Sequence, residues 1–372
     1  MAIYIHQLKN WTHFIWDNDV LIHKLAHVRN MQGKLVGKLE ILGFDLKEEA
    51  NLLTLTEDVI KSSAIEGEQL DKDQVRSSIA RRLGLDISGL IPSDRNVDGV
   101  VEMMIDAVNN ALRPLTEERL FNWHAALFPT GRSGMYKIQV AQWREDIDGP
   151  MQVVSGPLGR ENIHFQAPDS KNVPNEMRFF LKWFNEQQNL DTVLKAAIAH
   201  FWFVTIHPFD DGNGRIARTL GDMILTRADG NNKRFYSMSS QIRQNRKEYY
   251  EVLEHTQKGD QDITKWLLWF CDNLLLAIEN AKQILTKVIQ KHHFYRLFGS
   301  MLENERQKKI ITMMLDGFEG KLNTTKWAKI NKVSTDTALR DINDLLKKNI
   351  LLKSISGGRS TSYELNLKKI TD

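Results

Sequence analysis

The distribution of proline is the feature that most constrains how this chain can fold. All eight prolines lie between Pro92 and Pro208, so that the 91 residues before them and the 164 residues after them contain none. Proline removes a backbone donor and interrupts a helical hydrogen-bond ladder, so proline-free stretches with periodic apolar residues favour helix. The two flanks are therefore predicted to be helical and the middle third to hold most of the loops. Loops on a rigid scaffold are common places for binding and catalytic residues.

Composition restricts the class of protein. The 372 residues suggest two to three domains, at about 150 residues per domain. The net charge of +3 is too small to attract the whole chain to nucleic acid or to an anionic membrane. No apolar run approaches the ~18 residues of a membrane span, and the N-terminus lacks the pattern of a signal peptide. The single cysteine, Cys271, cannot form an internal disulfide and indicates a reducing compartment. We expect a cytoplasmic, multi-domain protein with no membrane partner.

Apolar periodicity predicts several elements. Helices are expected over residues 71–83, 97–111 and 191–206, and Gly67 is expected to close an earlier helix. Residues 151–168 have a different pattern, with short apolar runs on either side of a turn region at 155–159 that holds two glycines and Pro157. This pattern is typical of a small β-hairpin.

The stretch HPFDDGNGRIAR, residues 207–218, carries the chemistry. The residue before a proline disfavours helix, so one helix should end at His207, and apolar periodicity starts a new helix after Gly214. The first backbone N–H groups of a helix have no partner within it and bind anions, helped by the helix dipole. The sequence therefore predicts a phosphate site at Gly212, Asn213 and Gly214.

Charged neighbours strengthen this interpretation. Arg215 and Arg218 can add charge-assisted hydrogen bonds to phosphates, and Asp211 offers an oxygen ligand for Mg²⁺. His207 can accept a proton at neutral pH. A Walker-type loop is excluded, because the required Gly-Lys-Ser/Thr is absent. Each residue alone is more often structural, but their coincidence within twelve residues indicates phosphate chemistry.

This stretch resembles the signature of the Fic family, His-x-Phe-x-Asp/Glu-Gly-Asn-Gly-Arg-x-x-Arg, at every defined position. The resemblance covers about residues 97–276 and puts the predicted hairpin in the place of the family's "flap". It implies a mainly α fold, with a Fic-type helical core and a β-hairpin flap. Fic proteins mostly transfer the AMP part of ATP to Ser, Thr or Tyr hydroxyls of target proteins. The chain is thus expected to be a protein adenylyltransferase that performs AMPylation with ATP and Mg²⁺.

The resemblance also implies roles by motif position. His207 would be the general base and Asp211 the Mg²⁺ ligand. The transferring phosphoryl group would be stabilised by Gly212, Asn213 and Gly214. The outer phosphates would be bound by Arg215 and Arg218.

Two further regions receive roles from the same resemblance. Tyr250 and Gln257 lie where related proteins close the adenine pocket, although Tyr249 and Tyr250 are equally well explained as helix core. Val153 and Val154 on the hairpin would hold the target peptide by strand addition, which uses mainly main-chain contacts.

The segment SSAIEG, residues 62–67, resembles the inhibitory-helix motif of autoinhibited Fic proteins. Ser62 and Glu66 are four residues apart and so share one face of a helix. In that class Glu66 would pair with Arg218 and occupy the position of the γ-phosphate. The resemblance therefore implies a protein in a repressed state. It also leaves a homodimer open, since relatives of this type often dimerise.

Residues 301–372 are predicted to form a small winged helix-turn-helix domain. Ser334 is a good N-cap for a helix, and alternating apolar residues around a tip at 357–359 suggest a β-wing. Residues 303–372 hold 14 Lys and Arg against 9 Asp and Glu, which suggests DNA. The expected recognition helix, however, carries Asp336, Asp341 and Asp344, and carboxylates repel phosphates. We therefore favour protein contact or packing over DNA binding.

The predicted organisation has three parts. Residues 1–95 form a helical N-terminal region with the inhibitory helix, residues 96–300 the catalytic core, and residues 301–372 the winged-helix domain. Two other functions remain open. The same scaffold could remove AMP from a modified protein or transfer another phosphate-containing group, or the chain could be a nucleotide-sensing DNA-binding regulator.

Overall fold

The computed structural model describes residues 4–367, except 41, 86–88, 148, 157–159, 161, 188, 231–232, 316, 317, 319 and 355–360. The chain divides into two compact units, residues 1–282 and residues 283–372. Within the ranges described, no helix is both long enough and apolar enough to cross a bilayer.

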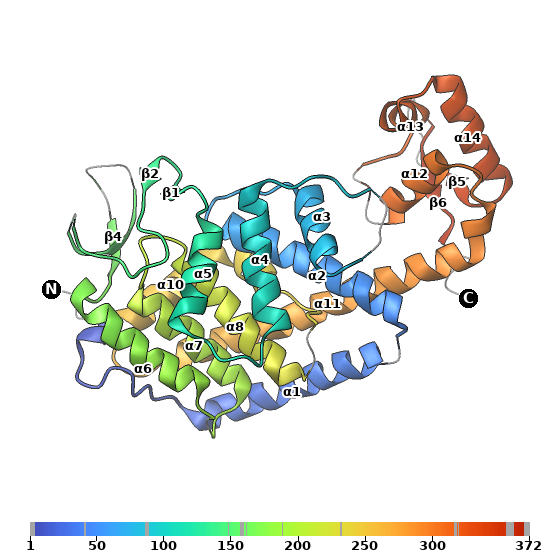
Figure 1. Cartoon of the computed structure of the whole chain (residues 1–372). Helices are drawn as coiled ribbons and strands as arrows, with labels where there is room; N and C mark the ends of the chain where they lie inside the picture. The colour runs from blue at the N-terminus through green and yellow to red at the C-terminus, as the bar shows by residue number, and fades with distance from the viewer. Residues whose placement is uncertain are drawn as a thin grey trace. The chain divides into compact units, whose positions relative to one another are not determined.

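The first unit is mainly helical, with small two-stranded sheets (Figure 1). Its elements are η1 (Ile5–Gln7), α1 (Asn18–Glu40), α2 (Phe44–Ile65), α3 (Lys72–Arg82), α4 (Arg95–Asn109), α5 (Glu117–Leu127), β1 (Arg132–Ser133), β2 (Tyr136–Lys137), β3 (Gln152–Ser155), β4 (Asn162–Gln166), η2 (Ser170–Asn172), α6 (Val173–Asn185), α7 (Thr192–Ile206), α8 (Asn213–Asp229), α9 (Met238–Gln244), α10 (Arg246–Gln257) and the start of α11 (Thr264–Phe298).

The core of this unit is built around α7, which is buried from Val193 to Ile206. A helix that is apolar on all sides is stable only when other elements surround it. Asp191 caps its N-terminus by accepting a hydrogen bond from the backbone of Val193 at 2.7 Å. Helix α8 packs along α7, and the six-residue turn between them carries the start of the predicted motif.

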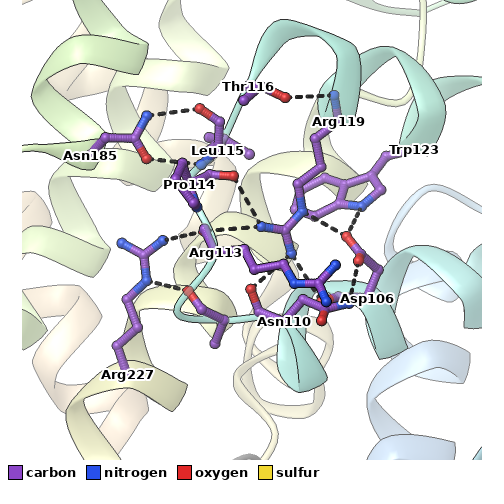
Figure 2. A network of polar contacts seen from close by, with 11 residues as sticks. Asp106, Asn110, Arg113, Pro114, Leu115, Thr116, Arg119, Trp123, Asn185 and Arg227 are labelled. Carbon is purple, nitrogen blue, oxygen red and sulfur yellow. Dashed lines mark hydrogen bonds and ion pairs between the residues drawn. The ribbon is translucent and has the colours of Figure 1, made fainter.

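A network of polar contacts joins α4, α5 and their neighbours (Figure 2). Arg119 of α5 donates from Nε to Asp106 of α4 at 2.7 Å, and Trp123 Nε1 donates to the same carboxylate at 2.7 Å. Partial burial acts to raise the pKa of Asp106, but these hydrogen bonds and the charge of Arg119 lower it. Asn185 of α6 and Arg227 of α8 bond to the backbone of the α4–α5 connection, which ties that loop to the core.

The hairpin β3–β4 is anchored at its base. Phe165 of β4 is 2% exposed and packs against Tyr4 and Ala167. His6 of η1 bonds through Nε2 to the carbonyl oxygen of Gln166 at 2.8 Å. The N-terminal segment therefore holds the base of a hairpin that lies about 160 residues further along the chain.

The second unit contains the end of α11, then η3 (Gly299–Met301), α12 (Glu305–Leu315), α13 (Thr324–Asn331), α14 (Thr335–Lys347), β5 (Leu351–Lys353) and β6 (Tyr363–Leu365). Strands β5 and β6 form an antiparallel hairpin. Two carboxylates of α14 are bound within the unit: Asp341 pairs with Arg306 at 2.8 Å and Asp344 with Lys348 at 2.7 Å.

The mainly α fold with a β-hairpin flap is confirmed. The helices predicted over 71–83, 97–111 and 191–206 are α3, α4 and α7, and the hairpin predicted over 151–168 is β3–β4. Ser334 caps α14 by accepting from the backbone of Thr337. Cys271 is buried, and burial raises the pKa of its thiol to about 12. The expected turn residues 157–159 and the tip at 357–359 lie outside the described residues. The three-domain division stays a prediction.

The close packing of α4 on α5 gives a test of the fold. A Cβ at Gly99 would lie 1.8 Å from the carbonyl oxygen of Ala126. We expect Gly99→Ala to lower the free energy of unfolding by roughly 1–3 kcal/mol. Gly33, exposed in α1 with nothing near its Cβ position, is the matched control. There the same change should stabilise by about 0.5–1 kcal/mol. If urea unfolding gave the same change in unfolding free energy for Gly99→Ala and Gly33→Ala, the close packing of α4 on α5 would be contradicted.

Burial of His200 in α7 predicts acid sensitivity. Burial lowers its pKa to about 3, and its Nε2 lies 2.9 Å from the Tyr249 hydroxyl. As pH falls below ~6.5, the unfolded chain takes up a proton that the folded protein does not, so stability falls by about 1.4 kcal/mol per pH unit. The loss of unfolding free energy between about pH 7 and 4.5 should therefore be smaller by about 2.5 kcal/mol in His200→Gln. An equal loss in wild type and His200→Gln would contradict this expectation.

Candidate active site

His207 ends α7 in a left-handed conformation. Its φ is +52°, a conformation that non-glycine residues seldom adopt. Ring atom Nδ1 lies 3.2 Å from the carbonyl oxygen of Val204, so Nδ1 carries the proton and Nε2 keeps its lone pair. Burial, with a smaller contribution from Arg144, lowers the pKa of His207 to about 4. The imidazole is therefore neutral at pH 7 and able to accept a proton at Nε2.

Arg144, which the sequence did not single out, holds the turn that carries His207. Its side chain is buried, and its Nε donates to the His207 carbonyl oxygen at 2.7 Å. Its backbone N–H donates to Pro208 at 2.9 Å, and Nη2 donates to the carbonyl oxygen of Pro168 at 2.5 Å. Asp146 balances its charge at 2.6 Å. Since Pro168 follows the flap, one side chain fixes the turn relative to the base of the hairpin.

Asn213 organises the loop from within. Its Oδ1 accepts from the backbone N–H of Phe209 at 3.0 Å, and its Nδ2 donates to the carbonyl oxygen of Phe209 at 2.8 Å. Gly212 has a φ of +82°, and a Cβ there would lie 2.9 Å from a ring carbon of Phe128. Only glycine fits this position without strain. The loop therefore positions α8 so that its first turn faces the site.

Asp211 stands beside the start of α8. One carboxylate oxygen accepts from the hydroxyl of Ser133 in β1, and the other accepts from the backbone of Gly212 at 2.5 Å. A carboxylate next to a hydroxyl offers the oxygen ligands that Mg²⁺ prefers. No cluster of three or more His, Cys, Asp or Glu gathers in the part of the chain that the structure describes. The residues therefore fit an ion shared with phosphates, since such an ion needs only one or two protein carboxylates.

Arg218 is buried in α8 and is contacted by the end of α2. Its Nε donates to the Ser62 hydroxyl and its Nη2 to the Ser62 carbonyl oxygen, each at 3.0 Å. Glu66 Oε1 lies 2.8 Å from Nη2. Burial acts to lower the pKa of Arg218, but the charge of Glu66 raises it. The same Glu66 oxygen lies 2.3 Å from where a Cβ of Gly214 would be, so the carboxylate rests against the first turn of α8.

The turn that ends α2 also presents a second carboxylate, Glu68, which the sequence did not single out. Gly67 has a φ of +89°, and Gly67 and Glu68 donate backbone hydrogen bonds to Ala64 and Ser63, respectively. This is the Schellman arrangement of a helix end. It places Glu68 2.9 Å from Arg215, whose side chain is 6% exposed. The end of α2 thus supplies one carboxylate to each arginine of the motif.

Each arginine keeps a donor that is not engaged. Nη1 of Arg218 and Nε of Arg215 are buried and have no hydrogen-bond partner among the described residues. Arg215 also lies over the ring of Phe128, 5.0 Å from its centroid. A buried donor without a partner is costly, so an anion that reached these atoms would be favoured.

Helix α10 carries the residues expected to close an adenine pocket. Tyr249 is buried and belongs to the core, whereas Tyr250 is about one-third exposed. Gln257 is buried and donates to the Thr205 hydroxyl of α7 at 3.2 Å. The core explanation therefore holds for Tyr249, and the pocket roles of Tyr250 and Gln257 stay predictions.

The two flap valines differ. Val153 packs against the cluster around Phe165, whereas Val154 is 47% exposed. A register shift falls between them, because Val153 pairs with Phe165 and Val154 with Ile163. Only Val154 is on the open surface.

Comparison with known proteins gives two family matches. Residues 114–225 match the Fic/DOC family, and residues 4–85 match a domain of unknown function, DUF4172. The second range contains Ser62, Glu66 and Glu68.

Two curated relatives are similar over about a quarter of this chain. The chain is 35% identical over 95 residues to a probable protein adenylyltransferase, aq_aa38, of Aquifex aeolicus. It is 36% identical over 98 residues to the protein adenylyltransferase fic-1 of Caenorhabditis elegans. These stretches cover only 27% and 18% of the two relatives.

The fold is shared with a solved structure. A Fic family protein from Desulfovibrio desulfuricans G20 has a TM-score of 0.51 and 19% identity, covering 92% of this chain and 96% of that one. The two family matches thus identify a Fic/DOC domain at residues 114–225 and a DUF4172 domain at residues 4–85.

Proposed function

We propose that this protein transfers the AMP part of ATP to a hydroxyl side chain of a target protein. The observation that carries the proposal is the arrangement at the α7–α8 turn. There a neutral imidazole with a free Nε2, a carboxylate and two buried arginines surround the first turn of one helix. Such transfer depends mainly on positioning and on electrostatic stabilisation of the phosphoryl group. The naming of the distant relatives as protein adenylyltransferases supports the same reaction.

The residues take distinct parts in this proposal. His207 Nε2 takes the proton of the target hydroxyl, whose oxygen attacks the α-phosphorus while the bond to pyrophosphate breaks. Gly212 and Gly214 allow the phosphates to approach the start of α8, and Asn213 keeps that loop in shape. Asp211 would hold Mg²⁺, which neutralises phosphate charge when bound. Tyr250 and Gln257 would contact the adenosine, and Val154 with its strand would receive the target segment.

We further propose that the arrangement described is a resting state. The Glu66 carboxylate lies beside Arg218 and against the first turn of α8. An anionic phosphate would bind at the same place. The Glu66 carboxylate and a phosphate cannot occupy this place at the same time, because two negative charges so close together repel strongly in a buried site. Glu66 thus competes with the outer phosphates of ATP.

Glu68 adds a second competitor in the same proposal. It pairs with Arg215, the other arginine expected to bind phosphate. Withdrawal of Glu66 alone would leave Arg215 neutralised. Repression is therefore shared between two carboxylates that one helix end delivers.

The target protein, a homodimer and DNA binding through residues 301–372 stay predictions. Two alternative reactions, removal of AMP from a modified protein and transfer of another phosphate-containing group, would use the same residues at the α7–α8 turn. The labelling experiment below separates transfer of AMP from transfer of the γ-phosphate.

Label from ATP tests the reaction directly. With Mg²⁺ and α-labelled ATP, Glu66→Gly should incorporate at least about tenfold more label into the protein than wild type, because Arg218 is released. Adding His207→Ala should reduce that incorporation by about a hundredfold or more, because the general base is lost. Glu57→Gln, at a carboxylate on the same helix that pairs with Lys61, is the matched control and should match wild type. Transfer of γ-label, or equal labelling of wild type and Glu66→Gly, contradicts the proposal.

Nucleotide affinity tests the second carboxylate. We expect Glu66→Gly with Glu68→Gln to bind a non-hydrolysable ATP analogue about three- to tenfold more tightly than Glu66→Gly alone, because Arg215 gains a free charge for phosphate. Titration calorimetry with Mg²⁺ measures the difference. Glu68→Gln alone should have a smaller effect, since Glu66 still opposes the phosphates. Identical affinity of the single Glu66→Gly and the double variant would show that Glu68 does not compete.

A further inference from the structure

The flap contains a line of hydrogen bonds that the proposed reaction does not use. The Ser155 hydroxyl of β3 lies 2.6 Å from His164 Nε2 of β4, and His164 Nδ1 lies 2.6 Å from Glu254 Oε2 of α10. The side chain of His164 is partly buried. The imidazole therefore connects both strands of the hairpin to a helix of the core.

A β-bulge in the hairpin sets the direction of the His164 side chain. Val153 pairs with Phe165 and Val154 with Ile163, so His164 is the extra residue that no partner faces. In a regular ladder His164 would lie opposite Val154, and the bulge instead brings its ring to Ser155. Bulges redirect side chains in this way and are frequent beside active sites.

The donors and acceptors along the line are matched. A carboxylate can only accept, so Nδ1 of His164 carries a proton and donates to Glu254. The remaining oxygen of Glu254 accepts from Lys258 at 2.5 Å. Partial burial acts to raise the pKa of Glu254, but hydrogen bonds from Lys258 and His164 lower it. Glu254 therefore stays ionised and keeps one oxygen for each donor.

Glu254 occupies a defined place on α10. It follows Tyr250 by four residues and precedes Gln257 by three, so the three side chains share one side of the helix. The base of the hairpin is held separately, through Phe165 and Tyr4. The contact of His164 with Glu254 lies one residue beyond that base, toward the exposed Val154 and Ile163.

We propose that His164 and Glu254 are positioning residues that clamp the flap to α10, and so fix the strand that receives the target relative to the helix that holds the nucleotide. The consequence for catalysis rests on the proposed function; the clamp itself does not. Proximity of this kind governs the rate of group transfer, because small displacements of an acceptor are costly.

Amide hydrogen exchange of the full chain without nucleotide tests the clamp. We expect exchange in residues 152–155 and 162–164 to be faster by about fivefold or more in both Glu254→Ala and His164→Ala. The double variant should exchange no faster than His164→Ala alone, because that variant already removes the contact with Glu254. Glu251→Ala is the matched control, since Glu251 is an exposed carboxylate on the same helix that pairs with Lys247. Unchanged exchange in both single variants overturns the proposal.

Kinetics in the Glu66→Gly background test the positioning role, with self-modification by α-labelled ATP as the readout. We expect kcat to fall about tenfold in each alanine variant while KM for ATP stays within about twofold. Glu254→Gln keeps an acceptor oxygen for Nδ1 of His164 and should restore most of the rate. A rise in KM for ATP in Glu254→Ala but not in His164→Ala would assign Glu254 to the nucleotide and overturn the positioning role. If no variant, including the parent, transfers AMP, the proposed function fails and the exchange result alone decides the clamp.

Discussion

The burial of Arg218 is the constraint on which the rest of the site depends. A guanidinium that is 2% exposed is stable only with counter-charges and acceptors around it. In the arrangement described, Ser62 and Glu66 supply them. Without a ligand, the end of α2 must therefore reach the start of α8 to supply these partners. In the function proposed above, a polyphosphate would bring negative charge and more acceptors to the same place, so that the helix end and the nucleotide would be alternatives for one cation.

Much of this site could be predicted, because its residues are contiguous. Residues 207–218 contain the turn, the helix start and both arginines, so spacing alone placed them together. Helices α3, α4 and α7 followed from apolar periodicity, which is a local signal. Gly67 was expected to close a helix, and its φ of +89° agrees with that expectation. Local chemistry accounts for each of these elements.

The contacts that the sequence did not reveal join distant segments. Glu68 and Arg215 are 147 residues apart, and His164 and Glu254 are 90 apart. Neither pair produces a periodic pattern in the sequence. The direction of the His164 side chain depends on a β-bulge, and the alternation of apolar and polar residues does not show where the strand register shifts by one residue. Arg144 acts on backbone carbonyl groups, and any residue type can supply those. The strands β1 and β2 have two residues each, too short for an alternating pattern.

The turn that ends α2 has a mechanical consequence. Glu66 and Glu68 reach the arginines only while Gly67 stays left-handed and the amide of Glu68 stays bonded to Ser63. This turn is a buried one, because Ser63 and Ile65 are fully buried and Ser62 accepts two hydrogen bonds from Arg218. Unwinding it would expose apolar surface and leave a buried guanidinium without these acceptors. Because the same turn carries both carboxylates, a change that displaced it would release Arg215 and Arg218 together.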